Sequence, residues 1–164
     1  MTTMTKETGV FELTLLNAEV RHQRIDDVLI MGLNRGIPAE IMTRLEDLWS
    51  TTKMIADELV AVGKIIVLTI FDFLKANPKL TIGLALGAAL ATLVAGIPFL
   101  GALLAPVFTV VSMVYGAAVG ASIDDGEVTT GPFVAVTNLA KKFFDLLKQI
   151  FLSVEDYLLA SEVR

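Results

Sequence analysis

The chain has 164 residues, of which 54% are hydrophobic and 19% charged; it has no cysteine, and its formal net charge is −5. This length fits one domain, the lack of cysteine excludes disulfides and thiolate metal sites, and the acidic balance argues against nucleic-acid binding, which needs a basic stripe. The apolar excess, compared with an average soluble domain, points towards a membrane.

The N-terminal third is predicted to begin with a tail and a helix. Residues 1–10 lack the basic and apolar segments of a cleaved secretory signal, and we expect a disordered tail there. Apolar residues at helical spacing, including Phe11 and Leu15, then predict an amphipathic helix over about 11–34. Such a helix needs a partner surface for its apolar stripe.

The only histidine of the chain, His22, lies on this predicted stripe. Glu19 and Asp26 are close enough along a helix to pair with it. His22 is therefore a candidate pH-sensitive group, because histidine titrates near neutral pH. The favoured interpretation is simpler: a partly buried histidine that those carboxylates satisfy.

A second amphipathic helix is predicted over about 38–76, where apolar residues recur at alternating spacings of four and three. It ends before Pro78, because the residue that precedes a proline disfavours helical angles. The strongly apolar part, 59–74, contains Lys64 and Asp72. A third membrane span there is thus the less favoured alternative to packing beside the segment that follows.

That next segment contains no charged residue and no histidine between Lys79 and Asp124. It is too long for one membrane-spanning helix of about 20 residues and suits two helices with a tight turn. We predict a hydrophobic transmembrane hairpin at 79–123, with helices at about 79–96 and 100–122. Glycine and proline favour a sharp chain reversal. The predicted turn residues are Gly96, Pro98 and Gly101.

Small residues recur every four positions along both predicted hairpin helices. In lipid, such ridges let helix backbones approach closely and associate. We therefore expect a homo-oligomer in a lipid bilayer, and the alternative is that the ridges only pack the hairpin against itself. The residues of this helix-association ridge are Gly83, Gly87, Ala91, Ala95, Gly116 and Gly120.

Polar side chains are few in the uncharged run. Thr109 and Ser112 are candidate pore-lining residues, although such side chains more often bond back to their own helix. The run has no ionisable group at neutral pH, which argues against a proton relay or an ion-coupled transporter. Lysines on both sides of the run and an uncharged turn predict a membrane protein with both termini in the cytoplasm.

The C-terminal part is predicted to be an acidic loop, 124–131, and an amphipathic helix, 132–164. The loop suits a solvated turn better than a calcium site, because it lacks alternating oxygen ligands. The helix shows a seam with four-three spacing that includes Phe143 and Leu147. Its mixed charges favour packing on helices of this chain or of a protein partner over binding to a membrane interface.

Together these features predict an all-α fold in which a membrane-inserting two-helix hairpin, at about 79–122, is flanked by amphipathic helices packed as a bundle or collar. A hairpin buried inside a water-soluble bundle is the alternative. One histidine and no cysteine leave no usual zinc spacing, and no phosphate loop or nucleophile motif is present. The sequence therefore predicts no enzyme and no cofactor.

The layout of an uncharged helical hairpin between amphipathic helices resembles that of pore-forming bacteriocin domains and of small curvature-inducing hairpin proteins. No specific motif is shared, so no residue role is transferred. We expect a self-assembling membrane protein that forms a pore or permeabilises the bilayer. The alternatives are a structural membrane-anchored scaffold or curvature-shaping protein without conductance, and a virion component that inserts into a host membrane.

Overall fold

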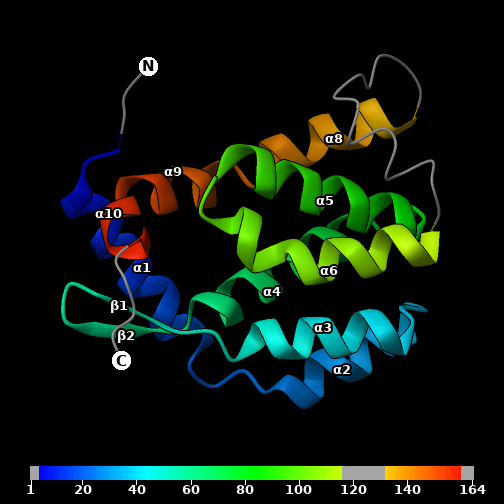
Figure 1. Ribbon diagram of the computed structural model, residues 1–164, viewed down its shortest axis with the longest axis horizontal. Coiled ribbons are helices and arrows are strands. Elements are labelled where there is room, and N and C mark those ends of the chain that lie inside the picture. Colours follow the sequence, from blue (N-terminus) through cyan, green and yellow to red (C-terminus); the bar gives the residue numbers. More distant parts are fainter. Residues whose placement is uncertain (1–3, 116–131, 160–164) are drawn as a thin grey trace.

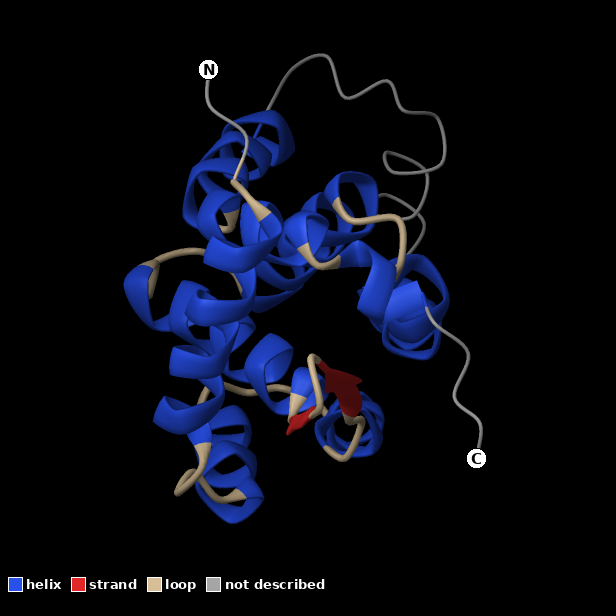
Figure 2. Ribbon diagram, turned by 90° about the vertical axis from the view of Figure 1, so that its left-hand side faces the viewer, coloured by secondary structure: helices blue, strands red, loops and turns tan. Residues whose placement is uncertain are grey.

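The computed structural model describes residues 4–115 and 132–159 (Figure 1). These residues are mostly helical, as predicted, and the one exception is a small antiparallel pair of strands (Figure 2). The elements in chain order are α1 (Lys6–Val20), α2 (Ile25–Asn34), α3 (Ala39–Trp49), β1 (Lys53–Ile55), β2 (Glu58–Val60), α4 (Val62–Ala76), α5 (Ile82–Gly96), α6 (Leu100–Tyr115), α8 (Pro132–Phe143), α9 (Asp145–Ser153) and α10 (Glu155–Leu159).

The helices form a stack with α5 inside it. Helix α2 packs on α3, α3 packs on both α4 and α6, and α5 contacts α4, α6 and α8. Helices α2 and α8 therefore lie at opposite ends of the stack, at the bottom and top of Figure 1. Helix α1 packs on α4 and α9, and α10 packs on β1. Helix α5, the most apolar of these helices, is thus covered by α6 from the same hairpin and by α4 and α8.

The prediction of a disordered tail over 1–10 is wrong from residue 6 onward. Helix α1 begins at Lys6, and Thr5 caps it: the Thr5 hydroxyl oxygen accepts a hydrogen bond from the Thr8 amide at 3.1 Å. A threonine in this position satisfies one of the amide groups that the first helical turn leaves unpaired. The cap explains why the helix extends towards the N-terminus beyond the first strongly apolar residues.

The predicted single helix over 11–34 is two helices, because the chain breaks after Val20. Helix α1 packs on α4 and α9 whereas α2 packs on α3, and one straight helix could not reach both surfaces. Asp26 and Asp27 occupy the first turn of α2, where carboxylates favour the positive end of the helix dipole. The predicted stripe is also displaced: Phe11 and Leu15 are exposed.

The predicted helix over 38–76 is likewise interrupted, by β1 and β2. Met54 pairs with Leu59 across the two strands. The turn that joins them places Ala56 and Asp57 at φ of 52° and 70°, a left-handed conformation that favours glycine or asparagine. Aspartate is common in such turns but alanine is not, so the pair Ala56-Asp57 is a weak signal for a hairpin beside the four-three apolar spacing.

The strand pair is attached to α1 through Asn17. The Asn17 side-chain amide donates hydrogen bonds to a Glu58 carboxylate oxygen at 3.1 Å and to the Leu59 carbonyl at 3.2 Å. Its side-chain oxygen accepts a hydrogen bond from the Ala61 amide at 2.9 Å. One side chain thus pairs three polar groups at the junction between the strands and α4.

The predicted helix over 132–164 is three short helices within its described part, which ends at residue 159. Phe144 and Val154 separate them, and both residues are buried. The breaks let one apolar stripe follow a curved surface, since α8 contacts α5, α9 contacts α1 and α10 contacts β1. A continuous straight helix would leave one of these surfaces uncovered.

Candidate functional site

The uncharged hairpin is the candidate functional site, and its two helices are α5 and α6. Helix α5 is buried without interruption from Ala85 to Leu90, and α6 buries Leu104, Val107 and Val111. The chain reverses at 97–99, between the helices. The remainder of the predicted hairpin and the predicted loop 124–131 lie outside the described residues.

The predicted ridge of small residues has two different environments along α5. Gly83 and Gly87 are buried, Ala91 is half-buried and Ala95 is exposed. At Gly83 the close neighbour belongs to the same hairpin, because a Cβ there would lie 2.6 Å from the Tyr115 ring atom Cδ1. The predicted positions outside the described residues are Gly116 and Gly120.

The turn of the hairpin is contacted by two lysine side chains. A Cβ at Gly96 would lie 3.2 Å from Cδ of Lys148, which comes from α9. The ammonium nitrogen of Lys53, in β1, lies 5.5 Å from the centre of the Phe99 ring. Of the other predicted turn residues, Pro98 is exposed, whereas Gly101 lies in the first turn of α6 and not in the reversal.

Three phenylalanines join the two helices that flank α5, and we call them the phenylalanine clasp. The ring of Phe73, in the last turn of α4, lies 5.3 Å from the ring of Phe143 and 5.4 Å from that of Phe144, centre to centre. Phe143 and Phe144 are themselves 5.3 Å apart. Because α4 and α8 both contact α5, the clasp holds them together around it.

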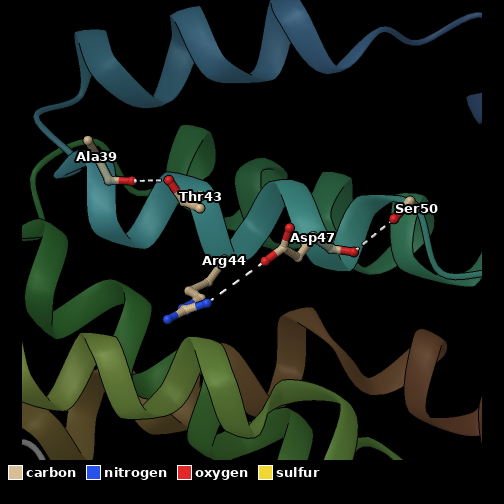
Figure 3. Close-up of polar contacts among 5 residues, drawn as sticks. All are labelled: Ala39, Thr43, Arg44, Asp47 and Ser50. Carbon is tan, nitrogen blue, oxygen red and sulfur yellow. Dashed lines mark hydrogen bonds and ion pairs between the residues drawn. The ribbon is translucent and has the colours of Figure 1, made fainter.

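The two candidate pore-lining residues do not share one environment. Thr109 is exposed and lines an open hollow between α3 and α6, together with Arg44 and Met113, whereas Ser112 is half-buried. Figure 3 shows Arg44 extending from α3, with its guanidinium turned towards Asp47 at 3.9 Å. The hollow thus has an apolar side from α6 and a polar side from α3.

His22 is not part of the apolar surface that the sequence suggested. It is exposed in the turn that follows α1, because the helix ends two residues earlier. The described residues contain no group of three or more histidine, aspartate or glutamate side chains arranged to hold a metal ion.

Two hydroxyl groups, one on the hairpin and one on α8, are buried without a hydrogen-bond partner among the described residues. They are Thr92 Oγ1, on α5, and Thr137 Oγ1, on α8. Helices α5 and α8 pack on each other. A buried hydroxyl without a partner costs free energy, because it has lost its hydrogen bond to water. Each of these hydroxyls therefore lowers the stability of the fold.

Replacing Thr92 with valine is expected to raise the free energy of unfolding by about 1 kcal/mol, because valine has the same shape without the unpaired hydroxyl. Urea denaturation followed by circular dichroism measures the change. Thr109→Val is the matched control, since Thr109 is exposed and on the same hairpin. A decrease in stability for Thr92→Val would show that this hydroxyl has a partner.

Sequence reasoning missed the phenylalanine clasp and the contact of Lys148 with the turn. The adjacent pair Phe143-Phe144 was a visible signal, because two aromatic residues in succession widen the apolar stripe of a helix and need a large neighbouring surface. Phe73 gave no comparable signal, since it lies in a run that is apolar throughout.

The described helices were also compared with the dimensions of a bilayer. None of them combines the length and the apolar composition needed to cross a membrane. The prediction that the hairpin inserts is therefore not supported by the helices as they are packed here, and it stays a prediction. Comparison with family models, with curated proteins and with solved structures found no match to this chain.

Proposed function

We propose that this protein acts on membranes by releasing the α5–α6 hairpin from the helical stack into a bilayer, where several copies assemble into a pore. The observation that carries the proposal is the burial of an uncharged helix, α5, between amphipathic helices that could separate from it. An ordinary soluble bundle has polar residues on at least one side of most helices, whereas α5 and α6 have no charged residue at all.

The uncharged sequence is long enough for the proposed insertion. The segments from Leu80 to Gly96 and from Leu100 to Ile123 both fall in the range of about 17–25 residues that a spanning helix needs. Lipid tails are as apolar as the core that surrounds α5, so exchanging protein contacts for lipid contacts costs little. The amphipathic helices left behind can place their apolar stripes at the membrane interface.

Self-assembly is the second part of the proposal. Once α5 leaves the stack, the buried Gly87 and the half-buried Ala91 become available to another helix. Small residues at this spacing allow close contact between helices in lipid. We propose that this contact forms the homo-oligomer and that Thr109, exposed on α6, lines its lumen.

A reversible crosslink tests whether the hairpin must be released. In the double variant Gly96→Cys/Lys148→Cys, the sulfur at 148 would occupy the position of Lys148 Cγ, 3.7 Å from a Cβ at 96. In a disulfide, with its S–S bond of about 2.0 Å, this distance is about 3.0 Å, so a shift of the side chain at 148 by less than about 1 Å closes the bond. The chain has no other cysteine, so no competing disulfide can form. A direct substitution of Gly87 is less informative, because Gly87 is buried in the stack.

The oxidised double variant is expected to release dye from liposomes about 30-fold less than the same protein after reduction. A disulfide of this kind stabilises the crosslinked state by about 2–4 kcal/mol and so lowers the population of the open state. The single variant Gly96→Cys is the control for the substitution itself. Equal release by oxidised and reduced protein, or no release and no flotation with liposomes in either state, would overturn the proposal.

The same measurement separates the pore from the alternative function. If the reduced protein floats with liposomes and its hairpin is protected from protease but no dye escapes, the pore is excluded. A membrane-anchored scaffold is then the function that remains, since insertion occurs without conductance. Electron microscopy of those vesicles would show whether their shape changes.

A further inference from the structure

The charged residues of the chain are divided unevenly between the parts of the stack. Residues 62–115 and 132–153, which comprise the hairpin, α4, α8 and α9, contain six basic residues and two acidic ones. Residues 4–60 contain six basic and ten acidic residues. The protein is acidic as a whole, yet the part formed by residues 62–115 and 132–153 has more basic than acidic residues, whereas the adjoining segments 116–131 and 154–159 have five acidic residues and no basic one. The basic residues in that part are Lys64, Lys75, Lys79, Lys141, Lys142 and Lys148.

Of the two carboxylates in this basic part, only Asp72 has a cationic partner within the described chain. Asp72 lies 3.6 Å from the Lys75 ammonium nitrogen, and Asp145 accepts a hydrogen bond from the Gln149 side-chain amide at 2.6 Å. The Gln149 amide is neutral, so Asp145 keeps its charge, but Lys141 and Lys142, both exposed on α8, outnumber it there. An anionic surface would therefore be attracted to the α8 end of the stack and repelled by the acidic residues of α2 and α3 at the other end.

The same end of the stack exposes a stripe of large apolar side chains. Leu139, Phe143 and Leu146 follow one another at spacings of four and three, and their exposed fractions are 47%, 38% and 56%. Lys142 directly precedes Phe143 of this stripe and is exposed. An amphipathic surface of leucine, phenylalanine and lysine matches the interface of a bilayer, where the rings enter the acyl region and the ammonium groups meet phosphates.

We propose that this face of α8 and α9 is the docking surface for an anionic lipid bilayer, an inference that rests on the proposed insertion of the hairpin. Docking there would place α8 between the membrane and α5, since α8 packs directly on α5. Phe143 belongs to both the exposed stripe and the phenylalanine clasp. A membrane that draws the Phe143 ring away from Phe73 loosens the clasp, so docking on this face promotes release of the hairpin.

Flotation with vesicles of phosphatidylcholine, with and without an equal share of phosphatidylglycerol, tests the docking surface. The wild type is expected to bind the anionic vesicles, and binding should weaken as salt screens the lysine charges. Lys141→Gln/Lys142→Gln is expected to reduce binding by about 10- to 30-fold, because each lysine near an anionic membrane contributes about a fivefold factor. Thermal unfolding of each variant checks that the fold is unchanged.

Matched variants at the acidic end of the stack provide the controls. Arg21→Gln/Arg24→Gln removes the same charge from exposed residues, of which Arg24 forms an exposed ion pair with Asp26 at 3.3 Å, and it should leave binding within about twofold of the wild type. For the apolar stripe, Leu139→Ser/Leu146→Ser should weaken binding. In the corresponding control, Ile30→Ser/Leu33→Ser, the side chains are 59% and 58% exposed on α2, and binding should be unchanged.

The outcomes separate this inference from the proposed function. If the protein releases dye equally from both kinds of vesicle, or if the controls lose as much binding as the test variants, the docking surface is wrong while insertion stands. If anionic vesicles are bound through α8 and α9 but the hairpin never inserts, the docking surface is supported and the proposed insertion is wrong. If no vesicle is bound, both are wrong.

Discussion

Replacing Phe73 with alanine is expected to lower the free energy of unfolding by about 3–5 kcal/mol. Phe73 is fully buried and its ring contacts both Phe143 and Phe144, so the substitution removes a large apolar side chain and leaves a cavity in the clasp. Urea denaturation followed by circular dichroism measures the loss. Because the clasp joins α4 to α8, dye release from liposomes should increase at the same time.

The control for Phe73→Ala is Phe11→Ala, which removes the same side chain from an exposed position on α1. Phe11→Ala is expected to change the free energy of unfolding by no more than about 0.5 kcal/mol, as is usual for surface substitutions. If Phe73→Ala destabilises the fold yet leaves dye release unchanged, the clasp stabilises the bundle but does not control the hairpin.

The substitution Gly63→Ala is expected to lower the free energy of unfolding by about 3 kcal/mol or more. Gly63 lies at the start of α4, where a Cβ would overlap the carbonyl oxygen of Leu48 and lie 2.8 Å from its carbonyl carbon. These are backbone atoms at the end of α3, so relieving the overlap requires the two helices to move apart. The midpoint of thermal unfolding of Gly63→Ala reports the effect.

Gly101→Ala is the matched control for Gly63→Ala. A Cβ at Gly101 would have no neighbour within 4 Å, and the residue is helical. Alanine should therefore raise the free energy of unfolding by about 0.5–1 kcal/mol, because it restricts the unfolded chain and favours a helix. Equal effects at the two positions would mean that α3 and α4 are not in close contact.

The hairpin could be located from the sequence because its signal is local: absence of charge, with glycine and proline at its centre. The breaks in the flanking helices could not, because their apolar spacing continues across Arg21, Thr52 and Phe144. At each of these places the chain changes direction to reach a different neighbour, which is a property of the whole stack. Apolar periodicity shows that a face is buried, but not which element buries it.

The environment of the candidate site could not be predicted from the sequence either. Uncharged composition indicated a hairpin that needs an apolar environment, yet composition does not distinguish lipid from a protein core. The helices around α5 provide that environment here, and this corresponds to the alternative of a buried hairpin. The phenylalanine clasp was not predicted, because Phe73 and Phe143 lie on helices that are distant in sequence.

The position of α8 in the stack has a consequence for synthesis of the chain. Helix α4 is synthesised before α5, and α6 directly after it. Helix α8 is synthesised only after α6 and residues 116–131. At translation rates of about 5–20 residues per second, one side of α5 stays uncovered for roughly 2–10 s while the later residues are added. During that interval the nascent chain exposes its most apolar helix, and chaperones or a nearby membrane can capture it before its own cover exists.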